Sequence, residues 1–432
     1  MVKGEWSSAA ESVEELGRNV MQANLLEILQ CPYCGGSFSL KEGASLRRSG
    51  DEITTGLLCC HCTSYPIVDG IPVLTTTYCG DALQHLLETD PQQALFTVLE
   101  LDDERQAGFE RFLAQGEAGT YRECIELFSP GDEGPYFVHR FANPTYLIGQ
   151  AILRAAGSDR RCFAKRAIDL AGGSGHLTRA LCQIAGGAEV FLAETNFWKL
   201  WIARRITAPG CIPICGDAEA PLPFKAGSFS LAFCSDAFHY IWSKRMFACE
   251  MMRLVGADGV IVVNHVHNAL RENHSAGLPL PPALWRNLLA EMGVRVFKES
   301  EVLDGVIEHR ALDLSHDYSD EELSDEQALF MIATRFSDIF RVYDYPGGQT
   351  AAGEWRINPL YEVEQTERGA SLRLQFPSPS YEDEYQACKR YLPEQVELSA
   401  EVLKRLAAGE WDGTLRELAA RYVVLDLPKG YL

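Results

Sequence analysis

Length, composition and charge limit the classes of protein to which this chain belongs. Its 432 residues are 47% hydrophobic, enough for two or three domains with buried cores. The 60 acidic and 39 basic residues give a net charge of −21, which disfavours nucleic-acid binding because such binding depends on neutralising phosphates. We find no run of about 18 uncharged apolar residues to cross a membrane. The first residues also lack a signal-peptide core, so we expect a cytoplasmic protein.

Cysteines at ligand spacing predict a metal site in an N-terminal domain, residues 1–79. Two C-x-x-C pairs can surround Zn²⁺ tetrahedrally, with Cys31, Cys34, Cys59 and Cys62 as the predicted ligands. Four thiolates leave no open coordination position, so the zinc would be structural and not catalytic. Cys60 and His61 lie inside the second pair, and either would substitute if the register differed. Most of the other cysteines occur singly in apolar runs and are expected to be reduced core residues.

The segment from Leu25 to Leu74 resembles a zinc-ribbon family whose members accompany methyltransferases. The matching sequences are Cys31-Pro-Tyr-Cys34, Cys59-Cys-His-Cys62 and Tyr65-Pro-Ile-Val-Asp-Gly-Ile-Pro. Some members are separate activator subunits, and others are fused ahead of an rRNA-methylating domain. The resemblance implies a methyltransferase downstream but does not select its substrate.

Residues 80–150 are predicted to form a helical connector or lid. Apolar positions recur at steps of three and four between Asp81 and Phe128, and a second apolar helix is expected from Leu147 to Ala156. Helices placed just before a nucleotide cradle can cover its ligand. Tyr136, His139 and Tyr146 are therefore candidate substrate-side residues, with plain packing as the alternative role.

Strand and helix signals alternate within residues 151–335, which predicts a parallel sheet covered on both faces. The first strand, Ala167–Leu170, leads into a glycine-rich turn and a helix start, which together form a nucleotide-type cradle. Further strands are expected at residues 188–193, 211–215, 229–234, 260–264, 294–297 and 328–333. A helix is expected from Leu284 to Met292, and residues 299–324 are expected to be an acidic, irregular loop or lid.

Acidic residues follow the second and third strands of this predicted sheet. Glu194 can accept hydrogen bonds from both ribose hydroxyls of a nucleoside, and Asp217 can accept one from an adenine amino group. A dehydrogenase begins with the same strand, turn and acidic tip. However, Gly216-Asp217-Ala218 suits an adenine pocket with no second nucleotide, which favours a methyl donor over a nicotinamide cofactor.

In order, these residues resemble the class I S-adenosylmethionine-dependent methyltransferases. The matching stretches are Ile168–Gly175, Glu194-Thr-Asn, Gly216-Asp-Ala, Pro221-Leu-Pro-Phe224, Gly227-Ser-Phe229, His239, Glu250, Arg253-Leu254 and Gly259. The resemblance implies a Rossmann-like, seven-stranded sheet. It also implies a cofactor site made of Asp169, Ala171, Gly172, Gly173, Gly175, Glu194, Thr195, Asp217, Ala218 and Ser235.

The same resemblance implies a role for each part of that site. The glycines would form the turn beside the methionine part, Glu194 would hold the ribose, and Asp217 with Ala218 would hold the adenine. Two residues depart from the family pattern. Ala171 replaces the usual first glycine, which costs little if its φ is negative, and Glu194 replaces the usual aspartate while keeping both acceptor oxygens.

Three histidines follow the fourth and fifth predicted strands, where such sheets bind substrate. His265, His239 and His267 are candidate catalytic bases, needed only if the methyl acceptor is a hydroxyl, a protonated amine or an acidic carbon. Their alternative role is to cap or to pack. A His-x-His metal site is a further alternative, although no matching acidic cluster is evident in the sequence.

Residues 336–432 are predicted to form an additional α+β domain with no recognised family. Strands are expected at Ser371–Phe376 and Val423–Leu427, and Ser399 is expected to cap a helix from Ala400 to Ala408. The domain is a candidate for substrate recognition, with a dimer contact or a partner surface as alternatives.

The sequence therefore predicts a transferase that moves a methyl group from S-adenosylmethionine to a small molecule or peptide, in secondary metabolism. Its predicted cofactors are S-adenosylmethionine and structural zinc, and neither nucleic acid nor a membrane is expected as a partner. A homodimer remains open. The alternatives are an rRNA or tRNA methyltransferase that uses the zinc ribbon for recognition, and a non-catalytic scaffold that binds the cofactor or a protein.

Overall fold

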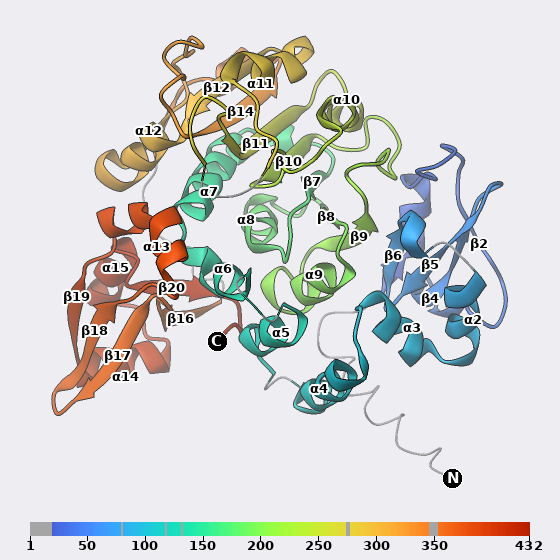
Figure 1. Ribbon diagram of the computed structural model, residues 1–432, viewed down its shortest axis with the longest axis horizontal. Helices are drawn as coiled ribbons and strands as arrows, with labels where there is room; N and C mark the ends of the chain where they lie inside the picture. Colours follow the sequence, from blue (N-terminus) through green and yellow to red (C-terminus); the bar gives the residue numbers. More distant parts are fainter. Residues whose placement is uncertain are drawn as a thin grey trace.

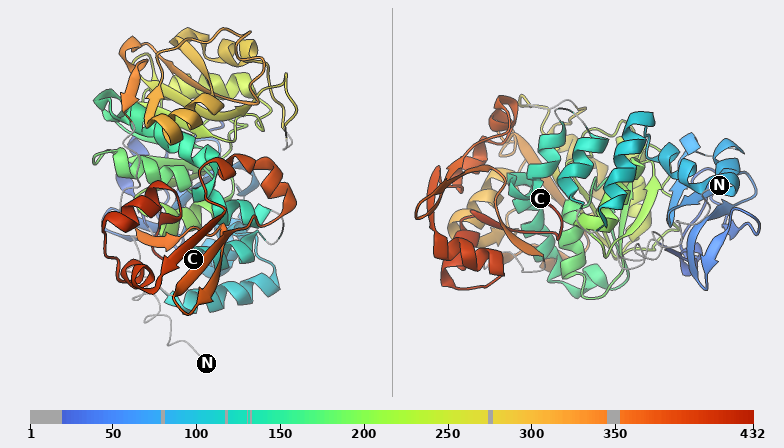
Figure 2. Two further views of the ribbon diagram at one scale, coloured as in Figure 1. Left: turned by 90° about the vertical axis from the view of Figure 1, so that its left-hand side faces the viewer. Right: turned by 90° about the horizontal axis from the view of Figure 1, so that it is seen from below.

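The fold is known from a computed structural model that describes residues 20–78, 81–116, 119–129, 131, 133–273, 277–344 and 353–432. A large mixed sheet forms its centre, a blue N-terminal unit lies beyond one edge, and an orange-red unit lies on the opposite side of the molecule (Figures 1 and 2). Among the described residues, no helix is both long and apolar enough to cross a membrane.

Seven neighbouring strands at one end of the sheet carry the predicted α/β alternation. Its strands lie in the order β9 (Ile212–Gly216), β8 (Val190–Glu194), β7 (Ala167–Leu170), β10 (Leu231–Ser235), β11 (Val260–His267), β14 (Ala328–Thr334) and β12 (Val294–Lys298). The first five are mutually parallel, and β14 runs antiparallel to both of its neighbours. The carboxyl ends of the parallel strands therefore meet at one edge, where ligands bind in sheets of this kind.

Both faces of these strands are covered, so the strands are almost wholly apolar and buried. The helices that follow or precede them are α7 (Pro144–Gly157), α8 (His176–Ile184), α9 (Phe197–Ile202), α10 (Lys244–Val255) and α11 (Pro282–Leu288). Helix α9 is short because the chain changes to a π-helical turn at Ala203–Thr207.

The N-terminal unit joins the same sheet. Its strands are β1 (Met21–Gln22), β2 (Ser39–Leu40), β3 (Arg47–Ser49), β4 (Glu52–Cys59), β5 (Ser64–Val68) and β6 (Ile71–Leu74). Strand β6 pairs in parallel with β9, with Val73 opposite Cys215 and Leu74 opposite Gly216. The described sheet thus has 13 strands, and the seven from β9 to β12 form the end opposite the N-terminal strands.

Five helices connect the N-terminal unit to α7, as predicted for this region. They are α2 (Asp81–Thr89), α3 (Pro91–Val98), α4 (Asp103–Ala114), α5 (Tyr121–Phe128) and α6 (Glu133–His139). Their starts follow capping rules: Asp90 and Asp102 cap α3 and α4, and Thr120 forms a capping box with Glu123 at α5.

The segment after β12 is more regular than predicted. It begins with helix α12 (Glu299–Asp304), continues through a π-helical turn at Gly305–His309, and enters strand β13 (Ala311–Asp313), which pairs with β15 (Val342–Asp344). The expectation of an irregular loop from residue 299 is therefore wrong for its first part. Glu299 and Glu301 lie in the first turn of α12, where carboxylates stabilise a helix.

The C-terminal unit, residues 353–432, contains two small antiparallel sheets and three α-helices. Strands β16 (Glu354–Ile357) and β20 (Val424–Leu427) form one sheet, and β17 (Tyr361–Thr366), β18 (Gly369–Leu374) and β19 (Gln395–Ser399) form the other. The helices are α13 (Pro379–Glu384), α14 (Ala400–Ala408) and α15 (Gly413–Ala420). Ser399 caps α14 as predicted, because its side chain accepts the N–H of Val402.

Candidate functional site

The glycine-rich turn after β7 has the shape expected of a ligand cradle. Gly173 and Gly175 have φ values of +56° and +82°, and a Cβ added to Gly172 would lie 2.5 Å from the Asp169 carboxyl carbon. Only glycine fits at that position. Ala171 has a φ of +55° and not the negative φ at which an alanine would cost little. Its left-handed conformation costs roughly 1–2 kcal/mol.

Asp169 ends β7 beneath this turn and is almost fully buried. One carboxylate oxygen accepts the hydroxyl of Thr178 at 2.7 Å, and the other has no hydrogen-bond partner among the described residues. Burial raises the pKa of Asp169 to about 7, and the nearby Glu194 carboxylate adds to the shift. A buried acceptor without a partner at the cradle fits a ligand that brings a hydrogen-bond donor or a positive charge.

Glu194 joins the turn to the end of the next strand. Its Oε2 accepts the N–H of Gly173 at 3.0 Å, and its Oε1 accepts the N–H groups of Thr195 and Asn196 at 2.8 and 3.1 Å. A carboxylate has about four acceptor sites, so one remains on Oε2 for a ligand hydroxyl. Thr195, a predicted cofactor residue, therefore lies beside the Glu194 carboxylate and donates its backbone N–H to it.

The remaining predicted cofactor residues lie at the ends of β9 and β10. Asp217 and Ala218 are partly exposed beyond β9, and the Oδ1 of Asp217 accepts the N–H of Glu219 at 2.8 Å. Ser235 ends β10 and accepts the amide of Asn264 at 2.9 Å. The structure therefore brings the predicted set to one edge of the sheet, and the unpaired oxygen of Asp169 and the remaining acceptor site on Oε2 of Glu194 fit S-adenosylmethionine.

A charged cluster that the sequence analysis did not identify lies next to this edge. Asp236, at a φ of +55° after β10, accepts the Tyr136 hydroxyl at 2.9 Å and pairs with Arg140 at 3.1 Å through Oδ2. Its Oδ1 lies 3.8 Å from the Nε2 of His265 and 4.0 Å from the Nε2 of His239. These last gaps are too long for direct hydrogen bonds and leave Oδ1 available to a bound group.

His265 is fixed from its other side by a carboxylate. Its Nδ1 lies 2.8 Å from the Oε2 of Glu299, the first residue of α12. A register shift in β11 and a φ of +54° turn His265 out of the strand pattern toward Asp236. The imidazole therefore lies between two carboxylates, an arrangement that fixes its orientation.

The other two predicted histidines are packed together. The rings of His239 and His267 stack with centroids 3.8 Å apart, and the His239 side chain is fully buried. Neither ring nitrogen of His239 has a hydrogen-bond partner among the described residues. Of the three candidates, His265 alone combines partial exposure with carboxylate partners at both ring nitrogens.

The environments of His239 and His265 move their pKa values in opposite directions. Burial and the neighbouring His267 lower the pKa of His239 to about 3, so its imidazole is neutral. Burial also opposes the charge on His265, but Glu299 and Asp236 outweigh it and raise the pKa of His265 to about 9. In the ligand-free protein, His265 is therefore a cation at neutral pH.

The C-terminal unit supplies one side of this cluster. Tyr385, which follows α13, lies with its ring centroid 6.3 Å from that of Tyr136, and its side chain is buried. No hydrogen bond joins the Tyr385 hydroxyl to any residue in the described ranges. The pKa of Tyr385 is raised by burial, with further contributions from Tyr136 and Asp236, which places the phenol close to the charged cluster.

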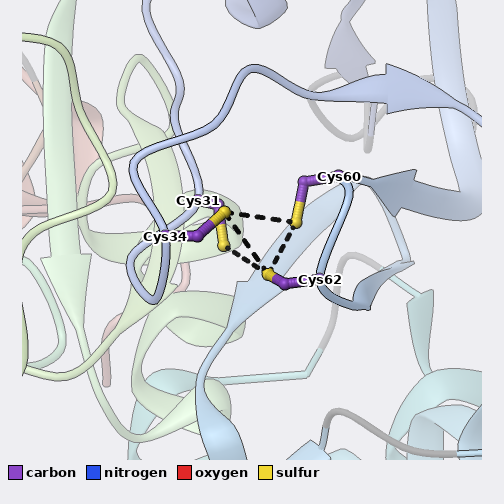
Figure 3. Close-up of side chains that lie close together, drawn as sticks. All are labelled: Cys31, Cys34, Cys60 and Cys62. Carbon is purple, nitrogen blue, oxygen red and sulfur yellow. Dashed lines mark hydrogen bonds between the residues drawn. The ribbon is translucent and has the colours of Figure 1, made fainter.

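The cysteine cluster of the N-terminal unit has the geometry of a zinc site. Its members are Cys31, Cys34, Cys60 and Cys62, whose sulfurs all lie within 4.8 Å of one another; Cys60 and Cys62 are 3.0 Å apart and Cys34 and Cys60 are 3.9 Å apart (Figure 3). Zn–S bonds of about 2.3 Å in a tetrahedron place sulfurs close to this range apart. The four sulfurs therefore fit a closed, structural zinc site.

Cys59 lies outside that cluster, which corrects the predicted ligand set at one position. It ends β4, and its sulfur contacts the Ser64 hydroxyl at 3.1 Å. Cys60 is the first residue beyond the strand, and its sulfur is directed toward the other cysteines (Figure 3). The residues of a strand alternate in direction, so a shift of one position exchanges the two cysteines. In the described chain, metal-ligand spacing occurs only at this cluster, so the His-x-His metal alternative gains no support.

One family model matches part of the chain. Residues 168–263 match the family model described as a methyltransferase domain, which is well under half of the chain. The match begins in β7 and ends in β11, so it contains the glycine turn and Glu194. No curated protein matches the sequence.

Several solved structures are similar to part of the chain. A putative methyltransferase from Bacillus halodurans is 16% identical, with a TM-score of 0.31, and covers 43% of this chain and 97% of its own. A possible histamine N-methyltransferase from Thermotoga maritima is 17% identical, with a TM-score of 0.32, covering 50% and 99%. A chain from the complex of the Haloferax volcanii Trm112 methyltransferase activator with a putative methyltransferase is 16% identical, with a TM-score of 0.30, covering 44% and 96%. Scores of this size support no inference about substrate or mechanism.

Proposed function

We propose that this protein transfers a methyl group from S-adenosylmethionine to a small molecule or peptide of secondary metabolism. The observation that carries the proposal is the bond between the Gly173 N–H and the Glu194 carboxylate, which joins the glycine turn to the next strand end. In this arrangement a nucleoside ribose and its attached chain would contact adjacent strand ends. The methyltransferase-domain match over the same residues supports the same conclusion.

Each part of the cradle has a proposed binding role. The turn at Gly172–Gly175 would hold the methionine part, Glu194 the ribose, and Asp217 with Ala218 the adenine. The cofactor supplies an activated methyl group on a sulfonium. The protein's task is then to bring the acceptor atom into line with that group at about 3–3.5 Å and to take up any proton released.

His265 is the proposed base for an acceptor that must lose a proton. The cofactor's positive charge disfavours the imidazolium, so binding lowers the pKa of His265 from about 9 toward neutral pH. Glu299 keeps the Nδ1 proton in place, which leaves the Nε2 lone pair directed toward Asp236 and the bound acceptor. Glu299 would orient the imidazole that acts as the base, as the aspartate does in the Ser-His-Asp triads of hydrolases.

The C-terminal unit is proposed to recognise the acceptor. Tyr385 places a hydroxyl without a partner in the described chain beside Tyr136 and Asp236, and a bound molecule would supply the missing hydrogen bond. The unit therefore contributes a wall of the acceptor site and not only a remote surface.

The test is calorimetric titration of the zinc-loaded protein with S-adenosylmethionine. We expect Glu194→Gln to weaken binding by about 10- to 100-fold, because a hydrogen bond to a charged group contributes about 1.5–3 kcal/mol. Glu189→Gln is the matched control: Glu189 precedes β8 and pairs with Arg166 at 2.6 Å near the surface. Unchanged affinity in Glu194→Gln contradicts the ribose assignment, and no binding by the unmodified protein favours the scaffold alternative.

A further inference from the structure

Tyr431, in the segment after β20, is buried between the glycine turn and the helices that precede it. Its ring stacks on that of Tyr121 in α5 with centroids 4.4 Å apart and planes 8° apart, and it meets His176 edge-on at 5.9 Å. The N–H groups of Tyr121 and Arg122 donate to the carbonyls of Gly430 and Tyr431 at 2.8 and 3.2 Å. The segment therefore satisfies donors in the first turn of α5, which would otherwise lack partners.

The directions of the hydrogen bonds around Tyr431 follow from its single hydroxyl proton. That proton is donated to the Phe137 carbonyl at 2.9 Å, so the Nε2 of His176, at 2.8 Å, must donate to the Tyr431 oxygen. Burial holds the pKa of His176 well below its usual value, so the ring is neutral and its Nδ1 is an acceptor. The Ser174 hydroxyl lies 3.5 Å from Nδ1 and 2.7 Å from the Tyr121 hydroxyl. Ser174 therefore donates to His176 and accepts from Tyr121.

This ordered chain connects the two sides of the proposed cofactor site. Ser174 is part of the glycine turn, and His176 is the first residue of α8, directly after it. Phe137 belongs to α6, and its ring lies 4.0 Å from where a Cβ on Gly173 would be. Helix α6 thus contacts the turn from one side, while Tyr431 binds both of them from another.

We propose that Tyr431 is a positioning residue that holds the glycine turn and helix α6 in the arrangement that binds the cofactor. The proposal rests on the proposed function. Tyr431 touches no part of the cradle that would contact the cofactor directly, so it acts through Ser174, His176 and Phe137. Without its hydroxyl, the His176 N–H and the Phe137 carbonyl lose their partner in a buried environment, and the binding arrangement becomes less populated.

The test compares Tyr431→Phe with Tyr361→Phe by titration with S-adenosylmethionine and by thermal unfolding. Tyr361 is a matched control because it is buried in the same unit and its hydroxyl donates to the Pro393 carbonyl at 2.9 Å, away from the turn. Both variants keep the ring; Tyr431→Phe loses the hydrogen bonds with Phe137 and His176, and Tyr361→Phe loses its one bond with Pro393. We expect Tyr431→Phe to weaken binding five- to tenfold, and Tyr361→Phe to lower the melting temperature without changing affinity. Equal affinities in the two variants would overturn the proposal.

Hydrogen exchange without any ligand separates this proposal from the proposed function. We expect Tyr431→Phe to increase amide exchange in residues 173–179 and 133–139 relative to Tyr361→Phe. If the unmodified protein does not bind S-adenosylmethionine, the proposed function fails while the exchange result still decides the role of Tyr431. Exchange that is the same in both variants across these two segments contradicts the positioning role.

Discussion

The N-terminal and C-terminal units are attached to the central sheet in different ways. The N-terminal unit adds its strand β6 to β9 and thereby continues the sheet through main-chain hydrogen bonds. The C-terminal unit adds no strand to this sheet in the described chain (Figure 1). It contacts the helices around the site through side chains and through two main-chain hydrogen bonds to α5. Among these contacts are the buried pair of Arg179 with Asp426 and the hydroxyl of Tyr431.

The difference indicates how changes in each unit would reach the site. Strand pairing depends on backbone geometry and tolerates many side chains, so the N-terminal unit stabilises the sheet edge as long as it is folded. We expect its folding in turn to depend on the cysteine cluster. The C-terminal unit contacts helix α8 and the charged cluster around Asp236 through individual residues, so single substitutions there should alter the site without unfolding the unit.

The largest effect is expected from loss of the proposed zinc. Cys60→Ser removes one of four ligands, and because structural zinc binding carries about 10–16 kcal/mol in small domains, we expect the N-terminal unit to unfold and β9 to become an exposed edge. Metal analysis and thermal scans with and without chelator provide the measurement. Cys59→Ser is the matched control, since Cys59 lies outside the cluster and should retain close to one zinc per chain. Zinc lost from Cys59→Ser but retained in Cys60→Ser would restore the ligand set predicted from the sequence.

That exchange of neighbouring cysteines shows where sequence reasoning is limited. Local patterns predict strand ends, the cap at Ser399 and the glycine turn, because each depends on residues close in the chain. The choice between Cys59 and Cys60 depends on the exact end of β4, and a difference of one residue reverses the side-chain direction.

The charged cluster around Asp236 and His265 is harder to predict because its members come from distant segments. Glu299 reaches His265 only through the pairing of β12 and β11 with β14 between them, which no local pattern specifies. Asp236 follows directly after Ser235, a predicted cofactor residue. Its position just beyond a strand end was the one local feature that could have indicated a role in the site. The joining of β6 to β9 is likewise a contact between segments more than a hundred residues apart, set by the tertiary fold.

The second prediction compares one ion pair from each unit. Asp426→Asn removes the carboxylate that pairs with the buried Arg179 charge and leaves only its 3.4 Å bond to the Asp426 backbone carbonyl, and we expect a loss of about 3–5 kcal/mol in the free energy of unfolding. Asp69→Asn, in the β5–β6 turn, should lose only about 1–2 kcal/mol. Asp69 is more exposed, and the guanidinium of Arg204 keeps its bond to the Asp69 backbone carbonyl at 2.5 Å.

Urea unfolding of both variants, with zinc present, measures the two losses. The smaller loss expected for Asp69→Asn assumes that the pairing of β6 with β9, and not Asp69, holds the N-terminal unit in place. A loss in Asp69→Asn that equals or exceeds the loss in Asp426→Asn would show instead that the N-terminal unit depends on the contacts of Asp69 with Arg204 and Arg205.

The smallest effect concerns pH and the cluster beside the C-terminal unit. The pKa of His265 is raised above its ordinary value, so its contribution to stability is fully present below about pH 6.5 and is lost as pH rises through about 9. We expect about 1–2 kcal/mol of stability to disappear over this interval, less than the full shift implies because His265 shares its charge with two carboxylates. Glu299→Gln should flatten the dependence, since it removes the carboxylate that contacts Nδ1. Asp69→Asn, far from the cluster, should leave the dependence unchanged, and the same flattening in both variants would show that the two units are not independent.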